Sequence, residues 1–442
     1  MDTPSYRVIA MQNYGPSGSL FMQSLLDGHP RILAIPAVFM LDFYYFWRRY
    51  GHLPSPVLVD RFVQLHDDWF HPNRYAASLG LTQMGDSMDE WVGVSLDTFR
   101  HELMQCLKQS KLIKRRDFML AVYQAYALTC GRSVEFADYI LYPAHSQHVE
   151  NIRQLMEDFP ETYFLHMIRD PIQSVGSEIK HILHERLPVN ATECALSQVL
   201  NDYCKHWSHV GRIAHGDRPY APELACVSRG IRLEDLHKRP RDVMEAVCHW
   251  LRLPWDECLL KSTFNGKLWW SRPESLRVSG FSTAIVAQRH DQHLWDFDKF
   301  RLTCVAWRKL DRWQYPVLTG AKSIVWQLLM PLLLWCPLKA ELKYLPRRLR
   351  DTIVEFPHRV VRFISSRPIA GKDVKDRWPW ISAALQRSCW LISAVIVVLS
   401  PVYVIRDYVA IRFWLFRAWL LNLLPGSPEV ELLPIPKSSQ PA

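Results

Sequence analysis

The feature that most constrains the fold of this 442-residue chain is a strand, a tight turn and a helix near its start. Tyr6–Met11 is an apolar run of strand length, and Gly15–Ser19 (GPSGS) follows before a segment with helical spacing. A turn of this kind points successive backbone amides and the positive end of a helix dipole at one spot. The sequence therefore predicts either an anion site for phosphate or sulfate, or a plain structural turn.

A second strand-to-helix junction carries an arginine. Tyr163–Ile168 has the pattern of a strand, Asp170-Pro171 ends it, and a helix follows. Arg169 closes the strand, and Ser177 lies eight residues later, one to two turns into the helix. A guanidinium and a hydroxyl spaced in this way can both reach one phosphate. The alternative interpretation is an arginine in a salt bridge and a serine that faces solvent.

Several other site chemistries lack their motifs. The ATP-binding pattern G-x-x-x-x-G-K-[ST] is absent, because Gly18 is followed by Ser19 and Leu20, which disfavours an ordinary P-loop kinase or ATPase. The ten cysteines include no C-x-x-C pair, so neither a zinc knuckle nor a redox dithiol is indicated. We expect no metal to be required.

Together these segments resemble the sulfotransferase family, whose members move a sulfuryl group from 3′-phosphoadenosine-5′-phosphosulfate (PAPS) to an acceptor. The turn Gly15–Ser19 is similar to the family's 5′-phosphosulfate loop, and Arg169-Asp170-Pro171 with Ser177 is similar to its 3′-phosphate motif. Asp138–Pro160 resembles the family's strand that ends in a proline and a histidine. Ile231–Pro254 resembles the stretch with E-D-L and a terminal L-x-L-P.

The resemblance implies an α/β fold, in which a parallel sheet is flanked by helices in the P-loop-like sulfotransferase arrangement, over residues 1–320. It also implies a site, with PAPS as the sulfuryl donor and no metal. The implied residues that bind PAPS are Gly15, Pro16, Ser17, Gly18, Ser19, Leu20, Arg169, Ser177 and Lys267.

His145 is the candidate general base, because an acceptor hydroxyl or amine must lose a proton and histidine can take it near neutral pH. It follows the Tyr139–Tyr142 strand, at the edge of an open parallel sheet where ligands bind. His29, His148 and His166 are its nearest rivals among the 18 histidines. The resemblance, rather than the spacing, selects His145.

Two positions depart from the family pattern. Pro16 stands where the family has a lysine or arginine before the Ser-Gly, and Tyr142 stands where a second basic residue often precedes the proline. Both departures remove positive charge from the transferring group, where charge neutralisation is usually the largest catalytic term. Either other cations replace that charge, or the chain is a catalytically inactive membrane scaffold; a P-loop phosphotransferase is a third hypothesis. The candidate replacements are Arg7, Lys267, Arg272 and Arg277.

The last quarter of the chain has a different composition. Residues 321–442 hold 17 Lys/Arg against 8 Asp/Glu, which equals the whole formal net charge of +9. The preceding part is formally neutral, so we expect no nucleic-acid partner. Two charge-free runs, Ser323–Leu338 and Ser388–Ile405, are marginal in length for spanning a bilayer. Residues 321–425 are therefore predicted to be a basic, apolar helical membrane anchor or a buried helical subdomain, and residues 426–442 a disordered tail.

The predicted setting is a membrane, with the catalytic domain facing the cytoplasm, because the start of the chain lacks a secretory pattern. That setting suits a membrane-bound acceptor, and the expected acceptor is a hydroxyl or amine of a glycan, a lipid or a lipid-linked glycan. The region Phe39–Leu128, which is rich in aromatic residues, is expected to be helical and to form the acceptor pocket.

Overall fold

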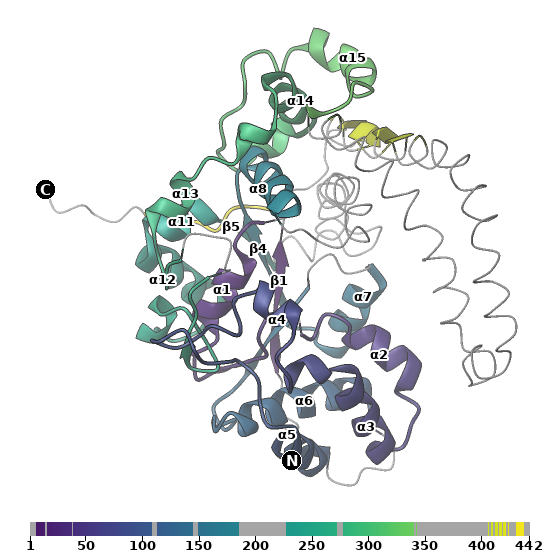
Figure 1. Ribbon diagram of the computed structural model, residues 1–442, viewed down its shortest axis with the longest axis vertical. Coiled ribbons are helices and arrows are strands. Elements are labelled where there is room, and N and C mark those ends of the chain that lie inside the picture. The colour runs from purple at the N-terminus through teal and green to yellow at the C-terminus, as the bar shows by residue number, and fades with distance from the viewer. Residues whose placement is uncertain are drawn as a thin grey trace, which may run out of the picture. The chain divides into compact units, whose positions relative to one another are not determined.

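The computed structural model describes residues 6–13, 16–37, 39–107, 113–144, 149–184, 227–271, 277–339 and 430–436, with single positions between 342 and 423. It contains a five-stranded, fully parallel sheet in the order β2-β3-β1-β4-β5. Figure 1 labels three of these strands, β1, β4 and β5. The strands are β1 (Arg7–Asn13), β2 (Ile32–Ala34), β3 (Tyr139–Pro143), β4 (Thr162–Ile168) and β5 (Ser228–Arg232).

The three central strands are apolar runs because both faces of the sheet are covered. Val8, Ile140 and Leu165 are among the side chains that are completely buried. In the register of β1 with its neighbours, Met11 lies opposite Pro143 and Asn13 lies opposite Met167. The carboxyl ends of β3, β1 and β4 therefore meet at one edge of the sheet, which confirms the predicted parallel sheet flanked by helices.

The chain forms two compact units, and the first contains residues 1–169, 209–289 and 428–442. Its longer helices are α1 (Ser19–Leu26), α2 (Phe43–Tyr50), α3 (Ser55–Leu65), α5 (Leu96–Leu107), α6 (Arg115–Thr129), α7 (Val149–Asp158) and α12 (Pro240–Leu251). Its shorter elements are η1 (Asp67–Trp69), α4 (Arg74–Ser78), α11 (Leu233–Lys238), η2 (Glu257–Leu260), β6 (Thr263–Phe264), β7 (Lys267–Leu268) and α13 (Thr283–Ala287).

The region between β2 and β3 is helical, as the sequence predicts, and packs through aromatic rings. Trp69 is completely buried, and its ring lies 5.4 Å from Phe62, 5.7 Å from Phe99 and 5.6 Å from Tyr126 between centroids. Rings of this size bury large apolar areas, and edge-to-face pairs add to the stabilisation. The acceptor pocket assigned to this region stays a prediction.

The second unit contains residues 170–208 and 290–427. The expected domain boundary at residue 320 stays a prediction. The elements of the second unit are α8 (Pro171–His184), η3 (Asp291–His293), α14 (Asp296–Arg312) and α15 (Ile324–Leu333). The first charge-free run, Ser323–Leu338, holds α15, which is only 10 residues long. Within the described part of the chain, we find no helix with the length and apolarity needed to cross a bilayer. The second run, through residue 404, lies outside the described residues.

Part of the expected disordered tail is ordered. The amide of Gly230 in β5 donates to the carbonyl of Glu431 at 2.8 Å, and the amide of Leu433 donates to the carbonyl of Gly230 at 2.9 Å. Val430 and Leu433 are buried. The segment 430–436 therefore extends the sheet beyond β5, and the prediction of disorder is wrong there because backbone pairing with an edge strand orders a sequence of low local propensity.

Candidate functional site

The turn after β1 requires a glycine at its end. Gly18 has φ +86° and stands immediately before α1, and a Cβ atom there would lie 2.4 Å from Cδ1 of Leu233 at the start of α11. A positive φ is strained for residues that carry a side chain, and an added Cβ would also force the end of the Leu233 side chain to shift. The turn therefore packs closely against the Leu233 side chain at the start of α11. Gly15 lies outside the described residues.

The first turn of α1 is suited to an anion. Gly18 has no side chain with which to cap the helix, and the first turn contains no acidic residue. Ser17, Ser19 and Leu20 are buried. Helix N-terminal amides that lack an intrahelical partner favour a negatively charged guest. The predicted phosphate-binding turn therefore has the required backbone form.

Arg169 lies beside this turn. Its guanidinium Nη1 is 3.4 Å from the carbonyl oxygen of Pro16, and its side chain is buried. The structure thus brings together the two motifs that lie 153 residues apart in the sequence. Pro16 itself contributes a carbonyl rather than a charge, so Arg169 supplies a buried positive charge at the turn.

The segment that contains His145 leaves the same edge of the sheet. The amide of Ala144, directly after β3, donates to the carbonyl of Met11 at 2.9 Å. His145 and His148 lie outside the described residues, so the role of His145 stays a prediction. Because β3 and β4 both pair with β1, the described flanks of His145, Gly18 and Arg169 belong to adjacent strand ends.

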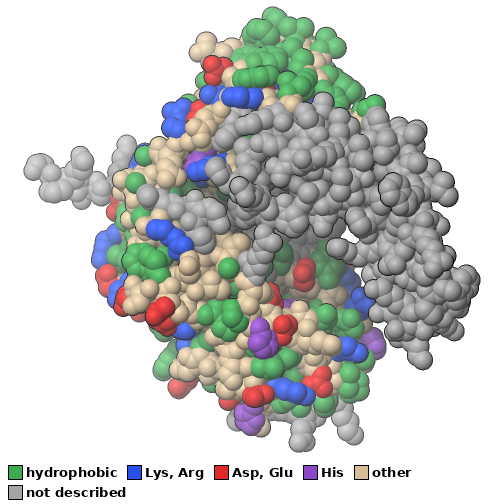
Figure 2. All heavy atoms as spheres, viewed as in Figure 1, with side chains coloured by type: hydrophobic (Ala, Val, Ile, Leu, Met, Phe, Trp, Pro, Cys, Tyr) green, Lys and Arg blue, Asp and Glu red, His purple; other side chains and the backbone are tan. Residues whose placement is uncertain are grey.

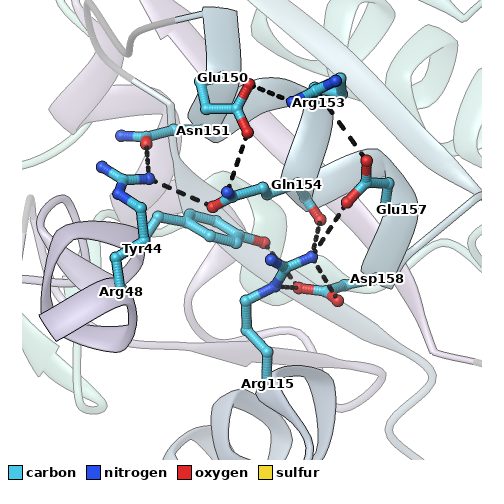
Figure 3. Close-up of polar contacts among 9 residues, drawn as sticks. All are labelled: Tyr44, Arg48, Arg115, Glu150, Asn151, Arg153, Gln154, Glu157 and Asp158. Atoms are coloured by element: carbon cyan, nitrogen blue, oxygen red, sulfur yellow. Dashed lines mark hydrogen bonds and ion pairs between the residues drawn. The ribbon is translucent and has the colours of Figure 1, made fainter. Parts of the chain in front are cut away.

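The far side of the His145 segment is fixed by α7, which polar contacts tie to α2 and α6 (Figure 3). Arg115 on α6 donates through Nε to the Asp158 carboxylate at 2.6 Å. Arg48 on α2 donates to Oδ1 of Asn151 at 2.7 Å. The hydroxyl of Tyr44 donates to the same Asp158 at 3.3 Å. Two ordered elements therefore bracket residues 145–148.

Two aromatic residues near the turn were not singled out by the sequence. Phe21 on α1 stacks on His237 of α11 with centroids 4.7 Å apart, and Phe281 meets Phe21 edge-on at 5.3 Å. The amide of Ser282 donates to Nδ1 of His237 at 3.1 Å, so that nitrogen carries a lone pair. Burial, together with the positive charge of Arg169, lowers the pKa of His237 from 6.5 to about 4. His237 is therefore a neutral ring that packs beside the turn.

The candidate replacement charges that the structure describes are paired with other groups. Arg7 begins β1, at the opposite end of the strand from the turn, and forms an ion pair with Asp138. The interpretation of Arg7 as a replacement charge is therefore wrong. The ammonium of Lys267 donates to the carbonyl of Trp91 at 2.7 Å and lies 3.3 Å from Glu90. Arg277 donates to Gln83, and Arg272 lies outside the described residues.

Two of the rival histidines, His29 and His166, are buried within the fold. His29 is buried, donates through Nε2 to the carbonyl of Pro254 at 3.0 Å and accepts from the amide of Arg31 at 3.2 Å. His166 is completely buried inside β4. Neither ring is exposed, so neither is suited to meet an acceptor.

Tyr142 and Ser177 complete the predicted positions. Tyr142 is completely buried, and its hydroxyl has no hydrogen-bond partner within the described part of the chain. Burial raises the pKa of this phenol well above its ordinary value, so it remains uncharged. Ser177 lies on α8 in the second unit, and its contribution to a phosphate site stays a prediction. No cluster of three or more potential metal ligands occurs among the residues that the structure describes.

Comparison with known proteins identifies the family through a sequence profile. The sequence profile of the sulfotransferase family matches residues 16–257. The sulfotransferase domain of a Synechococcus olefin synthase is 17% identical, with a TM-score of 0.33, and the match covers 59% of this chain and 78% of that one. The sulfotransferase domain from the curacin biosynthetic pathway is 15% identical, with a TM-score of 0.35 and coverages of 73% and 97%. A Mycobacterium avium sulfotransferase is 15% identical, with a TM-score of 0.33 and coverages of 58% and 67%. The curated proteins gave no match.

Proposed function

Because the chain belongs to the sulfotransferase family, we propose that it transfers a sulfuryl group from PAPS to a hydroxyl or amine of an acceptor. The observation that carries this proposal is the buried guanidinium of Arg169 beside the turn that ends in Gly18. A donor with phosphate groups at both its 3′ and 5′ positions needs two anion sites close together. The amide-rich turn and the arginine have the chemistry for these two sites.

In this proposal, the backbone amides of Ser17 to Leu20 bind the 5′-phosphosulfate, with the hydroxyls of Ser17 and Ser19 assisting. Arg169 binds the 3′-phosphate, and Ser177 on α8 adds a hydroxyl. Glycine at position 18 allows the positive φ of this turn and its close packing against Leu233. When bound, PAPS supplies the activated sulfuryl group.

In this proposal, His145 is the general base that accepts the proton from the acceptor. An alcohol becomes a stronger nucleophile as it loses its proton, and an imidazole with a pKa near neutrality can accept that proton. The strand β3 and the anchored helix α7 hold the two ends of the segment that contains this histidine. A base at this strand end would face the same sheet edge as the amide-rich turn.

The acceptor in this proposal is a glycan, a lipid or a lipid-linked glycan, and the catalytic unit works at the cytoplasmic side of a membrane. The support for this setting is the basic and apolar composition of residues 321–442. The aromatic helical region between β2 and β3 is the proposed acceptor pocket. Lys267 and its neighbours would cover the donor.

A second candidate function is a catalytically inactive scaffold that keeps the fold. The observation that favours it is Tyr142, which places an uncharged, buried phenol where sulfotransferases often carry a cation. In that case the chain would bind the nucleotide without turnover. Binding and turnover therefore have to be measured separately.

The experiment that tests the proposal is transfer of ³⁵S from labelled PAPS to extracted glycolipids by the full chain. His145→Gln should lose turnover and keep nucleotide binding, whereas His148→Gln serves as the matched control and should retain both. Turnover should persist when divalent metals are chelated, while a phosphotransferase would stop. Turnover in His145→Gln equal to that of the unmodified chain would remove His145 from the mechanism, and binding without any turnover would favour the scaffold.

A further inference from the structure

The helix α15 in the second unit is apolar apart from Gln327, and it buries only Gln327 and Met330. Its most exposed side chains are apolar, with exposed fractions of 74% for Ile324, 73% for Leu328 and 71% for Leu332. The polar residue Gln327 is buried on the opposite face. A water-facing helix shows the opposite arrangement, with its apolar stripe turned to the core. The outer surface of α15 is therefore suited to an apolar environment.

The inward face of α15 is satisfied by specific contacts. Nε2 of Gln327 donates to the carbonyl of Cys304 at 3.1 Å and to that of Ala321 at 2.6 Å, and its Oε1 accepts from the indole of Trp419 at 2.9 Å. A buried side-chain amide whose donors and acceptor are all hydrogen-bonded is stable in its buried position. The orientation of α15, with Leu328 and Leu332 outside, is thus fixed by its own packing.

The C-terminal end of α15 is held by a buried ion pair on α14. Arg301 pairs with Asp298 at 2.6 Å, and both side chains are almost completely buried. The same guanidinium donates to the carbonyls of Leu333 at 3.0 Å and Pro337 at 3.2 Å. A cation at this position satisfies the last carbonyls of the helix and its dipole. The exposed apolar surface therefore lies on a helix whose position is fixed by hydrogen bonds and a buried ion pair.

Another segment of the second unit also exposes an apolar side chain, next to a buried charged one. Phe413 is 60% exposed, while the adjacent Arg412 is buried and its guanidinium lies 4.2 Å from the ring centroid of Tyr408. The hydroxyl of Tyr408 donates to the carbonyl of Trp335, just beyond α15. Figure 2 shows hydrophobic side chains gathered over α14 and α15. We call the exposed side chains Ile324, Val325, Leu328, Leu332 and Trp335 the outer apolar face.

The charges around this face favour a lipid surface over a protein. No charged residue lies between Lys322 and Lys339, and Trp326 and Trp335 lie between these two lysines. Tryptophan and lysine are the residues that prefer the boundary between lipid headgroups and acyl chains. The 10 residues of α15 extend only about 15 Å, at 1.5 Å per residue, which fits a helix that lies in the plane of the surface.

We propose that the outer apolar face inserts into one leaflet of a membrane that contains anionic lipid, with α15 parallel to the surface. Lys322 and Lys339 lie at the level of the headgroups, and the formal charge of +9 in residues 321–442 adds attraction to anionic lipid. The outer apolar face lies wholly in the second unit. Its insertion is therefore independent of whether the first unit transfers a sulfuryl group.

The test is flotation of the full chain with vesicles of phosphatidylcholine, with or without about one third phosphatidylserine. Leu328→Glu/Leu332→Glu places two charges on the outer apolar face, and Leu65→Glu on α3 is the matched control, since Leu65 is also an exposed leucine, at 55%. Removing two inserted leucines should weaken binding at least about 100-fold, at about tenfold for each. Thermal unfolding of each variant checks that the fold is retained.

The proposal expects flotation of the unmodified chain and of Leu65→Glu, stronger with phosphatidylserine, and loss of flotation in the double variant. Equal flotation of the double variant and the control would overturn it. Failure of the unmodified chain to float, with self-association that the double substitution abolishes, would also overturn it. That result would assign the face to a second copy of this chain.

Discussion

Replacing Gly18 by alanine tests the geometry of the turn after β1. The backbone at Gly18 has φ +86°, which costs an alanine about 1–2 kcal/mol. The added Cβ would also lie 2.4 Å from Cδ1 of Leu233, and overpacking of this kind costs about 1–3 kcal/mol more. We therefore expect Gly18→Ala to lower the free energy of unfolding by about 2–5 kcal/mol and to weaken binding of 3′-phosphoadenosine 5′-phosphate.

Gly131 provides a matched control for the backbone part of this effect. It follows α6 with φ +71°, and nothing lies within 4 Å of the Cβ that an alanine would add. Gly131→Ala should therefore show the backbone cost alone and leave nucleotide binding unchanged. Urea unfolding followed by tryptophan fluorescence measures the first quantity, and calorimetry measures the second.

The reciprocal variant isolates the contact itself. Leu233→Ala removes the atom that the new Cβ would meet, so it should cost less in the Gly18→Ala background than in the unmodified chain. The expected coupling is about 1–3 kcal/mol, equal to the overpacking cost. Equal losses for Gly18→Ala and Gly131→Ala, together with an additive double variant, would refute the close approach of the turn to α11.

Three further predictions concern buried polar groups. The pKa of His237 is lowered to about 4, so the neutral ring stabilises the fold fully above about pH 6.5 and progressively less as the pH falls toward 4. The difference in free energy of unfolding between the unmodified chain and His237→Gln should therefore change by about 2 kcal/mol between about pH 7 and pH 5. Urea titrations at the two pH values measure this difference, and no change would contradict the neutral ring. Tyr142→Phe removes a buried hydroxyl that has no partner within the described part of the chain, so the free energy of unfolding should stay unchanged or rise by up to about 1 kcal/mol. A loss above about 2 kcal/mol in urea unfolding would mean that this hydroxyl is hydrogen-bonded. Arg301→Ala leaves Asp298 buried without its cation and should lower the free energy of unfolding of the second unit by about 3–5 kcal/mol. An unchanged melting temperature in a calorimetric scan would show that the ion pair is not needed for stability.

The sequence predicted the strands around the site because they are uninterrupted apolar runs of strand length. Residues 8–12 and 164–168 are buried, and short buried apolar runs of this length favour a strand over a helix. The turn at Gly18 and the arginine at position 169 were also predictable, because a glycine-containing turn and a charged residue at the end of a strand can both be recognised from neighbouring residues in the sequence. Their convergence follows from the sheet order alone, because β3 and β4 both pair with β1.

The missed features depend on contacts between distant segments. His237 lies 216 residues after Phe21, and only the packing of α11 on α1 brings the two rings together. The tail segment 430–436 became ordered through pairing with Gly230, whose lack of a side chain leaves room beside Ile168. Arg7 was misjudged because its charge was considered without its position at the opposite end of β1. Long-range packing decided each of these cases.

The most direct test of the account is calorimetric titration of the full chain with 3′-phosphoadenosine 5′-phosphate and with adenosine 5′-phosphate, which lacks the 3′-phosphate. The account predicts that the first nucleotide binds about 10–100 times more tightly, because a charge-assisted arginine contact contributes about 1.5–3 kcal/mol. Arg169→Ala should abolish that preference, and Arg241→Ala, which removes an exposed arginine on α12, should retain it. Equal affinity for the two nucleotides, or an unchanged preference in Arg169→Ala, would contradict the account.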